Sequence, residues 1–426
     1  MEKTDLGQRP LRILVFIIQF PPDVNSTGIL MDQICEGLLE YGHRITVITT
    51  FPHYEEFRIH EEFRGRLIER GQYHGLDVIR LCVYANGEKY RMTSRLLNYL
   101  SFNFLATAVN LVSRQTYDVI FCTNGSFFTG ISSYVSGKFG RIPFIYNVQD
   151  LYPDVPIRAG QLHNKNAITV LRKMERFMYE KAAHIAVIAP SFRKNLLEKG
   201  VSREKVSVIP NFVDTAFVRP MKKKNEFSIR HDLTDKFVVT HAGNLGYAYD
   251  LETMLEAALL LAPHENIVFL IIGDGVAKAH LQEKAQTLRL SNVRFLPFQP
   301  REYLPLIRAC SDVETSLYKP GASSDSMPSK VYEIMASGRP LLMSADEGSD
   351  VWNLVTETKS GICIGPGNAS ELADGVLSLY NNPSMGQKMG QRGRYQAEKN
   401  YSRDVVVRRY NGLLQQVARY HERTHS

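Results

Sequence analysis

The chain has 426 residues, of which 44% are hydrophobic and 22% are charged, so it is predicted to be a globular protein of two or three domains and not a disordered chain. Its five cysteines, at positions 35, 82, 122, 310 and 363, form no close pair. Neither a disulfide framework nor a zinc site is therefore indicated, and a reducing compartment is expected. The apolar run before Pro21 is only about eight residues long, which is too short for a signal peptide or a membrane span.

The net charge of +7 is concentrated in one segment. From Arg158 to Lys205 the chain holds eleven basic residues and four acidic ones. Such a surface favours an anionic partner, either phosphate groups or lipid headgroups, although a merely solvated basic face explains it as well. No basic stripe interleaved with aromatic residues accompanies it, so nucleic acid is not an expected partner.

Apolar runs alternate with helical patterns through the first half of the chain. The runs that predict buried strands lie at 12–20, 44–50, 117–124, 142–150, 184–191 and 205–214. A pair of strands is expected at 66–84, around His74 and Gly75. This alternation predicts an α/β domain with a doubly wound parallel sheet.

Two positions in this half follow strands directly. Gly28 lies where the first strand gives way to a helix, and Asp150 lies at the tip of the strand 142–150. Open α/β sheets bind ligands at the carboxyl ends of their strands, so both residues are candidate site residues. A plain turn or cap explains either of them equally well.

The segment 91–115 has no glycine or proline and is predicted to be one long helix. Its strongest apolar face is formed by Leu96, Leu97, Leu100, Phe104, Ala108 and Leu111, and Phe102, Leu105 and Val109 broaden this face. We expect so wide an apolar stripe to pack in the core, with interfacial membrane contact as the second interpretation.

The alternation restarts after the basic run at 221–226. Strands are predicted at 237–246, 266–275, 292–300, 311–318, 340–345 and 360–366. We therefore expect two Rossmann-like domains, at 1–214 and 215–400, with a final helix at 401–426 packing back on the first. Gly243 with Asn244, and Gly273 with Gly275, follow apolar strands and predict loops that approach a ligand closely.

The most informative stretch is the loop at 320–326 and the helix after it, which is predicted to run from about Pro328 to Gly338. Val331, Ile334 and Met335 form an apolar stripe on this helix, and Lys330, Glu333 and Ser337 form a separate polar face. A loop of small residues that leads into a helix N-terminus is suited to binding an anion.

Charged side chains lie on both sides of this N-terminus. Lys330 adds a positive charge next to Ser329, Glu333 can accept hydrogen bonds from vicinal hydroxyl groups, and Asp325 adds a second carboxylate eight positions earlier. The stretch thus predicts a site for phosphate, ribose and sugar. An ordinary surface helix with a solvated pair of Lys330 and Glu333 accounts for the same residues.

Six segments together resemble a known family: FPPDVNSTG, NVQDLYPD, VIPNFVD, AGNLG, IIGDG and, above all, DSMPSKVYEIMASGRP. The chain is similar over nearly its whole length to retaining glycosyltransferases of family 4 with the GT-B fold, close to exopolysaccharide and O-antigen enzymes of the WcaI and WbuB types. The resemblance implies two Rossmann-like domains that face a central cleft. The N-terminal domain would bind the acceptor and the C-terminal domain the nucleotide-sugar donor.

The resemblance also implies roles for individual residues. The E-x7-E motif of the family falls on Asp325 and Glu333, so that Glu333 would bind the ribose and Asp325 the donor sugar. Many relatives carry Arg and Lys shortly after the glycine that matches Gly243, whereas this chain has Asn244 and the segment YAYD at those places. Lys330 is then the better candidate for neutralising the diphosphate, and Asp150 would orient or deprotonate the acceptor hydroxyl.

The reaction implied by the resemblance needs no metal or other cofactor, and the chain contains no D-x-D motif. Retention would follow front-face displacement. The expected donor is a UDP-linked N-acetylated amino sugar or deoxy sugar, and the acceptor is lipid-linked or a saccharide. A cytoplasmic protein with peripheral contact to an anionic membrane is expected. A UDP-sugar 2-epimerase and a non-catalytic protein that binds nucleotide-sugars are the alternatives.

Overall fold

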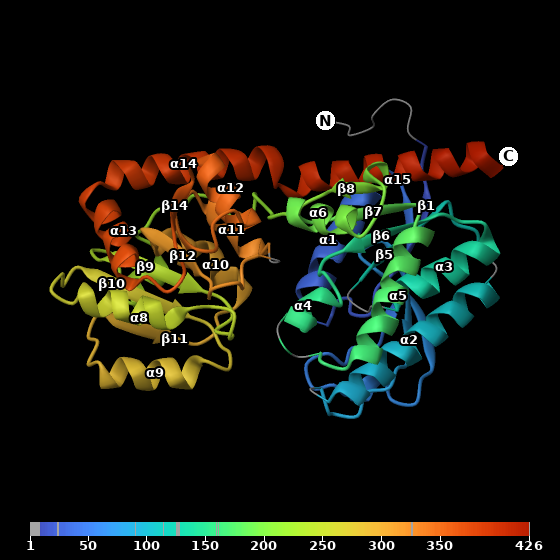
Figure 1. The fold of residues 1–426 in the computed structure, drawn as a ribbon, viewed down its shortest axis with the longest axis horizontal. Helices are drawn as coiled ribbons and strands as arrows, with labels where there is room; N and C mark the ends of the chain where they lie inside the picture. Colours follow the sequence, from blue (N-terminus) through green and yellow to red (C-terminus); the bar gives the residue numbers. More distant parts are fainter. Residues whose placement is uncertain are drawn as a thin grey trace. The chain divides into compact units, whose positions relative to one another are not determined.

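The computed structural model describes residues 9–425 apart from positions 24, 90, 114, 125–127, 159, 161, 325 and 326. The chain divides into two compact units (Figure 1). Unit 1 comprises Met1–Pro210 with Val406–Ser426, and unit 2 comprises Asn211–Val405. Each unit is a doubly wound α/β structure built on its own sheet, as the alternation of apolar runs predicts.

Unit 1 contains an eight-stranded sheet in the order β3-β4-β2-β1-β5-β6-β7-β8. Its strands are β1 (Arg12–Phe16), β2 (Arg44–Thr50), β3 (Ile68–Tyr73), β4 (Leu76–Leu81), β5 (Val119–Thr123), β6 (Phe144–Val148), β7 (His184–Val187) and β8 (Val206–Val208). All neighbours are parallel except β3 and β4, which form the expected hairpin. Central strands such as β5 and β6 are buried at every position, because helices cover both faces of a parallel sheet.

The helices of unit 1 connect these strands. They are α1 (Ser26–Leu39), α2 (Met92–Ser113), α3 (Thr129–Gly140), α4 (Asp154–Arg158), α5 (Lys165–Lys181), α6 (Pro190–Glu198) and the short 3-10 helices η1 (Glu61–Phe63) and η2 (Arg203–Lys205). The C-terminal helix α15 (Arg403–His425) packs on this unit from Val406 onward. There the buried Tyr410 hydroxyl accepts a hydrogen bond from Asn147 Nδ2 at 2.8 Å.

The orientation of α2 is the main correction to the sequence-based fold. Its expected core face is exposed at Leu96, Leu97, Leu100, Phe104 and Leu111. The buried positions are instead Ser94, Asn98, Phe102, Asn103, Ala106, Val109 and Asn110. The prediction of core packing is therefore wrong for the five exposed residues and confirmed for Phe102 and Val109. Among the described residues, α2 is the one helix that is long and apolar enough to cross a membrane, by length and composition alone.

Unit 2 contains a six-stranded parallel sheet in the order β11-β10-β9-β12-β13-β14. Its strands are β9 (Phe237–Ala242), β10 (Ile267–Ile272), β11 (Val293–Leu296), β12 (Val313–Leu317), β13 (Leu341–Ser344) and β14 (Gly361–Ile364). Alternate residues of β10 serve two cores: Phe269 packs in a cluster with α8, and Leu270 packs in a cluster on the opposite face with Ile307 of α10.

The helices of unit 2 are α7 (Glu226–Arg230), α8 (Leu251–Leu260), α9 (Lys278–Thr287), the 3-10 helix η3 (Arg301–Tyr303), α10 (Leu304–Cys310), α11 (Ser329–Ser337), α12 (Asp350–Thr358), α13 (Ala369–Asn381) and α14 (Pro383–Asn400). β9 lies between β10 and β12 in the sheet. The loops that leave the carboxyl ends of these three strands are therefore neighbours, and this is where the candidate site lies.

Candidate functional site

The loops after β9 and β10 approach each other closely at three glycines. A Cβ atom added to Gly273 would lie 1.9 Å from the carbonyl oxygen of Gly243, and Gly273 has a φ of +148°. A Cβ added to Gly275 would lie 2.8 Å from Oδ1 of Asn244. No larger residue fits at Gly273, so the structure brings together the four loop residues that the sequence singled out.

Helix α11 begins beside these loops. Val331, Ile334 and Met335 are fully buried as predicted, and Gly338 ends the helix in the left-handed conformation with φ +71°. Pro328 is the N-cap residue and provides no capping hydrogen bond from its side chain. Pro328 therefore does not occupy the N-terminal amide groups of α11, which are suited to bind an anion. Asp325 and Ser326, which precede the helix, lie outside the described residues.

The predicted polar face of α11 needs one correction. Ser329 and Lys330 lie in its first turn as expected. Ser337, however, is buried, and its hydroxyl donates a hydrogen bond to the carbonyl oxygen of Ile334 at 2.7 Å. It satisfies its hydroxyl on the preceding turn of the helix and is not part of a ligand-binding face.

Lys330 holds a buried amino group at the start of α11. Its Nζ atom makes no hydrogen bond with any described residue, and it lies 4.6 Å from the centroid of the Tyr249 ring. A Cβ added to Gly243 would lie 3.9 Å from this Nζ. Burial, with a further contribution from the nearby Arg308 charge, lowers the pKa of Lys330 to about 7. An anionic ligand would restore the charged form.

Glu333 is held by an arginine that the sequence analysis did not select. Arg308 of α10 donates a hydrogen bond from Nη2 to Oε2 of Glu333 at 2.6 Å, and its Nη1 contacts the carboxylate of Glu314 on β12. Arg308 and Glu314 are each 1% exposed, whereas the Glu333 side chain is 30% exposed. Glu333 is therefore not a solvated partner of Lys330. Its carboxylate is fixed from behind and still reaches the surface.

The charges of Arg308 and Glu314 shift each other's pKa values, and the charge of Glu333 shifts both. Burial by itself would lower the pKa of the Arg308 guanidinium, but Glu314 and Glu333 together raise it above its usual value. Burial raises the pKa of Glu314, although Arg308 opposes that shift. Nε of Arg308 and Oε1 of Glu314 lack hydrogen-bond partners among the described residues. Such unpaired buried atoms concentrate at functional sites.

A signal for Arg308 and Glu314 was present in the sequence. Each is a charged residue in an otherwise apolar element: Arg308 in the helix LPLIRAC and Glu314 in the strand VETSL. Charged residues are almost never fully buried unless they are paired, so two such residues in neighbouring buried elements predict an ion pair.

Together, the groups around α11 can bind a ligand that carries both phosphate and hydroxyl groups. Lys330 and the helix N-terminus favour the phosphate charge, and Glu333 can accept two hydrogen bonds. The glycine loops allow close backbone approach. All of these features lie in unit 2.

The other two predicted site residues lie in unit 1. The N–H of Gly28 donates to Oδ1 of its N-cap residue Asn25 at 2.6 Å, and an added Cβ would lie 2.8 Å from the carbonyl oxygen of Gln19. Helix capping and close packing therefore explain this glycine. Its assignment as a donor contact stays a prediction.

Asp150 is exposed in the loop that follows β6. The side chain of Asn124, at the end of β5, holds this loop by accepting hydrogen bonds from the N–H of Gln149 at 2.8 Å and of Asp150 at 3.4 Å, while its amide group donates to the Asp150 carbonyl. Although the Asp150 side chain is exposed, neighbouring protein atoms partly desolvate its carboxyl group and raise its pKa. Asn124 is thus a positioning residue that the sequence analysis missed.

The described residues include one group with the geometry to ligate a cation. Asp32, Glu36 and His74 bring their ligand atoms within 4.8 Å of one another, and Nδ1 of His74 lies 2.7 Å from Oε1 of Glu36. An ordinary histidine–carboxylate pair explains this contact, and none of the three residues belongs to unit 2.

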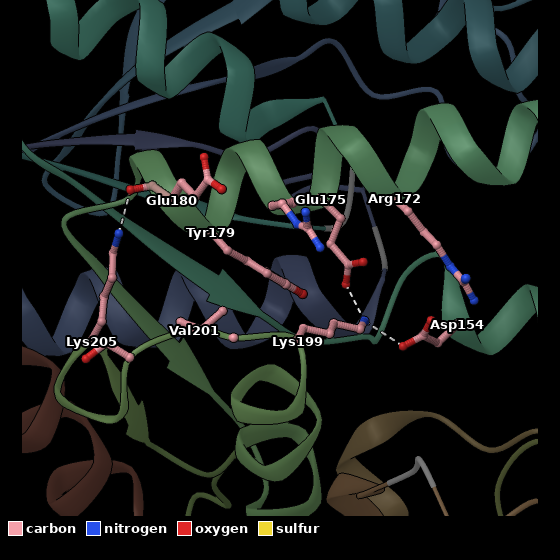
Figure 2. Close-up of a pocket in the computed structure, with 11 residues that line it drawn as sticks. Asp154, Arg172, Glu175, Tyr179, Glu180, Lys199, Val201 and Lys205 are labelled. Carbon is pink, nitrogen blue, oxygen red and sulfur yellow. Dashed lines mark hydrogen bonds and ion pairs between the residues drawn. The ribbon is translucent and has the colours of Figure 1, made fainter.

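A cavity of about 750 Å³ lies between α4, α5 and α6 of unit 1 (Figure 2). Lys199 bridges the carboxylates of Asp154 and Glu175 at 2.6 Å each, and the exposed Arg172 and Arg176 line the cavity. The basic segment from Arg158 to Lys205 thus builds a cavity whose described lining includes none of the predicted site residues.

The chain matches two family models. A model described as "Glycosyltransferase Family 4" matches residues 27–217, and one described as "Glycosyl transferases group 1" matches residues 222–396. The chain is also 26% identical over 410 residues to WcaI of Escherichia coli (strain K12), a glycosyl transferase named for colanic acid biosynthesis. This match covers 94% of the chain and 98% of WcaI.

Solved structures show the same fold at low sequence identity. Sucrose-phosphate synthase from Thermosynechococcus elongatus has a TM-score of 0.72 and 17% identity, covering 97% of this chain and 100% of that one. HepE from Anabaena, in complex with UDP-glucose, has a TM-score of 0.69 and 16% identity, covering 95% and 100%. With the two family models matching along both units, these findings establish that the chain belongs to the family 4 glycosyltransferases with the GT-B fold.

Proposed function

We propose that the protein transfers a sugar, with retention of anomeric configuration, from a UDP-linked donor to a lipid-linked or saccharide acceptor during cell-surface polysaccharide synthesis. The donor sugar in this proposal is an N-acetylated amino sugar or a deoxy sugar. The observation that carries the proposal is the buried Nζ of Lys330, which has no hydrogen-bond partner among the described residues and lies beside Gly243 at the N-terminus of α11.

The proposed donor mode assigns one part of the nucleotide-sugar to each group. The diphosphate lies against the amides of Ser329 and Lys330 and beside the Lys330 ammonium group. The ribose hydroxyl groups donate to Glu333, which Arg308 holds in place. Gly243, Asn244, Gly273 and Gly275 allow the backbone to approach the donor, and Asp325 contacts the transferred sugar.

Departure of the diphosphate is the step that this arrangement would accelerate. Negative charge grows on the leaving oxygen, and a preorganised ammonium group and helix amides stabilise such charge without a metal ion. In unit 1, Asp150 would orient or deprotonate the acceptor hydroxyl. Its raised pKa suits a group that takes up a proton.

Two relatives support the biological setting of this proposal. WcaI is named for colanic acid biosynthesis, and HepE was solved with UDP-glucose. From HepE we infer a UDP-linked donor for this chain, and from WcaI we infer a role in surface glycan synthesis. The lipid-linked acceptor and the basic excess of unit 1 favour work at the cytoplasmic face of the membrane.

A donor screen tests the proposal. The protein is incubated with UDP-, GDP- and TDP-sugars, with and without lipid-linked acceptors, and the products are separated by mass and by anomeric configuration. We expect transfer from a UDP-sugar with retained configuration, and the same rate in EDTA.

The other outcomes contradict the proposal in different ways. Conversion of a UDP-sugar without acceptor would identify an epimerase, and binding without turnover would identify a scaffold. Activity that EDTA abolishes and a divalent ion restores would reject the metal-free mechanism. An inverted product would reject retention.

A further inference from the structure

Helix α2 leaves most of its large apolar side chains exposed, whereas an ordinary surface helix buries them. Phe104 is 78% exposed, Val112 80%, Leu97 46% and Leu100 43%. The other exposed apolar residues of the helix are Met92, Leu96 and Leu111. A contiguous apolar surface of this kind on a soluble protein marks an interaction site.

Hydrogen bonds on the inner side of α2 fix this orientation. Nδ2 of Asn98 donates to the Tyr84 carbonyl at 2.8 Å and contacts Nε2 of the buried His53 at 3.0 Å. Ser132 of α3 donates to Oδ1 of Asn103 at 2.8 Å. Rotating the leucine face inward would break these bonds and leave buried polar groups unpaired, so the apolar face stays outward in the folded protein.

A groove of about 410 Å³ runs between α2 and α3 beside this face. Its walls include Leu100, Phe104, Leu111 and Ile131. The polar side chains that line the groove form hydrogen bonds within the helices. The Thr107 hydroxyl donates to the Asn103 carbonyl at 2.7 Å, and the Asn103 side-chain amide donates to the Tyr99 carbonyl at 2.7 Å. These hydroxyl and amide hydrogens are already used, so the groove suits a hydrocarbon occupant.

The charges around the groove distinguish between possible partners. Helices α2 and α3 carry Arg95 and Lys138 and no acidic residue, and both basic residues are exposed. Helix α5, which packs against α3 through the contact of Phe177 with Tyr134, carries five basic residues and two acidic ones. Like charges would oppose pairing with a second copy of this surface, whereas an anionic lipid surface attracts it.

We propose that the outward face of α2 and the α2–α3 groove form a membrane-docking surface that lies in the interface of an anionic bilayer, with lipid chains in the groove. Helix α2 lies along the membrane and does not cross it, because its inner face is bonded to unit 1. The inference deepens the proposed function by naming the surface that brings the enzyme to a lipid-linked acceptor.

Vesicle co-sedimentation tests the surface with a matched pair of variants. Leu97→Gln/Leu100→Gln removes two exposed leucines of α2, and Leu259→Gln/Leu260→Gln removes two leucines of α8 that are 44% and 55% exposed. Gln keeps helix propensity in both. We expect the full-length protein to bind phosphatidylglycerol vesicles, not phosphatidylcholine vesicles, and the α2 variant to bind at least about tenfold more weakly. The α8 variant should bind as the wild type does.

Charge and insertion are tested separately. Arg172→Gln/Lys173→Gln/Arg176→Gln should weaken binding and its dependence on salt, because α5 supplies the electrostatic attraction. The chain has one tryptophan, Trp352, so Phe104→Trp in a Trp352→Phe background places a single fluorophore on α2. Brominated lipids should quench this fluorophore and should not quench Leu260→Trp in the same background.

Three results would overturn the proposal: equal binding of the α2 variant and the wild type, no quenching at position 104 in the bound state, or a wild-type dimer that the α2 substitutions dissociate in the absence of lipid. The last result would assign the face to a second copy of the chain. UDP affinity, measured by calorimetry on the same proteins, is independent of this outcome. Its absence in the wild type would count against the proposed function and not against the docking surface.

Discussion

The two units share one architecture, but the loops at the carboxyl ends of their strands are held by different contacts. In unit 1, short polar side chains bond to the loops: Asn25 caps α1, Asn124 holds the loop of Asp150, and Asp23 accepts from the backbone of His53 and Tyr54. In unit 2, glycine loops pack directly on each other beside an ammonium group that has no described partner.

The difference is in what holds the described loops at this edge: side-chain hydrogen bonds to the backbone in unit 1, and glycine packing in unit 2. In unit 1 these side chains satisfy the loop amides of Gly28, His53 and Gln149. In unit 2, Lys330, Arg308 and Glu314 each have a buried atom without a hydrogen-bond partner among the described residues, and such atoms lower stability when they stay unpaired. If the proposed donor site is correct, binding of an anion beside Lys330 should stabilise unit 2.

The largest expected effect comes from breaking the buried pair in unit 2. Arg308→Met leaves Glu314 buried without its partner, which should lower the free energy of unfolding by about 3–5 kcal/mol. It also releases Glu333, so UDP binding should weaken by up to about a hundredfold, as for loss of the Glu333 carboxylate itself. Denaturant unfolding and calorimetry with UDP measure the two effects.

The double variant Arg308→Met/Glu314→Met separates positioning from stability. It replaces the pair by apolar side chains, so most of the stability should return. UDP affinity should stay low, because Glu333 still lacks the Nη2 donor. Recovery of full affinity together with stability would mean that Arg308 serves folding alone.

Lys330→Met should reduce kcat by about a hundredfold or more, as expected for a group that meets charge on the leaving diphosphate. Folding should be preserved, since Met fills a similar volume and removes an unpaired charge. Lys388→Met, at an exposed position of α14, is the matched control and should be silent. A raised KM with unchanged kcat would instead indicate uniform binding of donor and transition state.

Glu333→Gln should weaken UDP binding by about tenfold to a hundredfold, because a charged acceptor of hydrogen bonds is lost. Gln has a similar helix propensity, so α11 should form as before. Glu357→Gln on α12, which is exposed, controls for the loss of one negative charge in the same unit. Unchanged affinity in Glu333→Gln would show that α11 is not the donor site.

Sequence patterns correctly predicted the features that depend on residues close together in the chain. Both sheets, the hairpin and the apolar stripe of Val331, Ile334 and Met335 follow from periodicity of 2 or 3.6 residues. The glycine loops could be placed together because parallel strands end at one edge of the sheet. The position of Asp150 after β6 was also predictable.

Contacts between distant residues were not predictable in this way. Arg308 reaches Glu333 from 25 residues away, and no periodicity encodes that pair. The orientation of α2 depends on His53, Tyr84 and Ser132, which lie on other segments and bond to its asparagines. The apolar pattern placed the leucine face in the core, because such a pattern does not take account of buried asparagines that form hydrogen bonds.

The smallest expected effect is a proton taken up when UDP binds. The pKa of Lys330 is about 7 in the free protein, so its amine is mostly neutral at alkaline pH. A neighbouring diphosphate favours the charged form and raises this pKa, so binding at about pH 8.5 should take up close to one proton. UDP itself is fully ionised at that pH and contributes none.

The sign of the pH dependence follows from this linkage. Below the free pKa of about 7, Lys330 is already charged, and binding takes up no proton at that site. Above it, UDP affinity should fall as pH rises, by up to about tenfold per pH unit, until the pKa of the complex is reached. Calorimetry in buffers of different ionisation enthalpy measures the uptake directly. Lys330→Met should abolish the uptake and flatten the pH profile, while Lys388→Met should keep both. Equal proton uptake by Lys330→Met and the wild type would show that another group titrates on binding and that Lys330 does not contact the diphosphate.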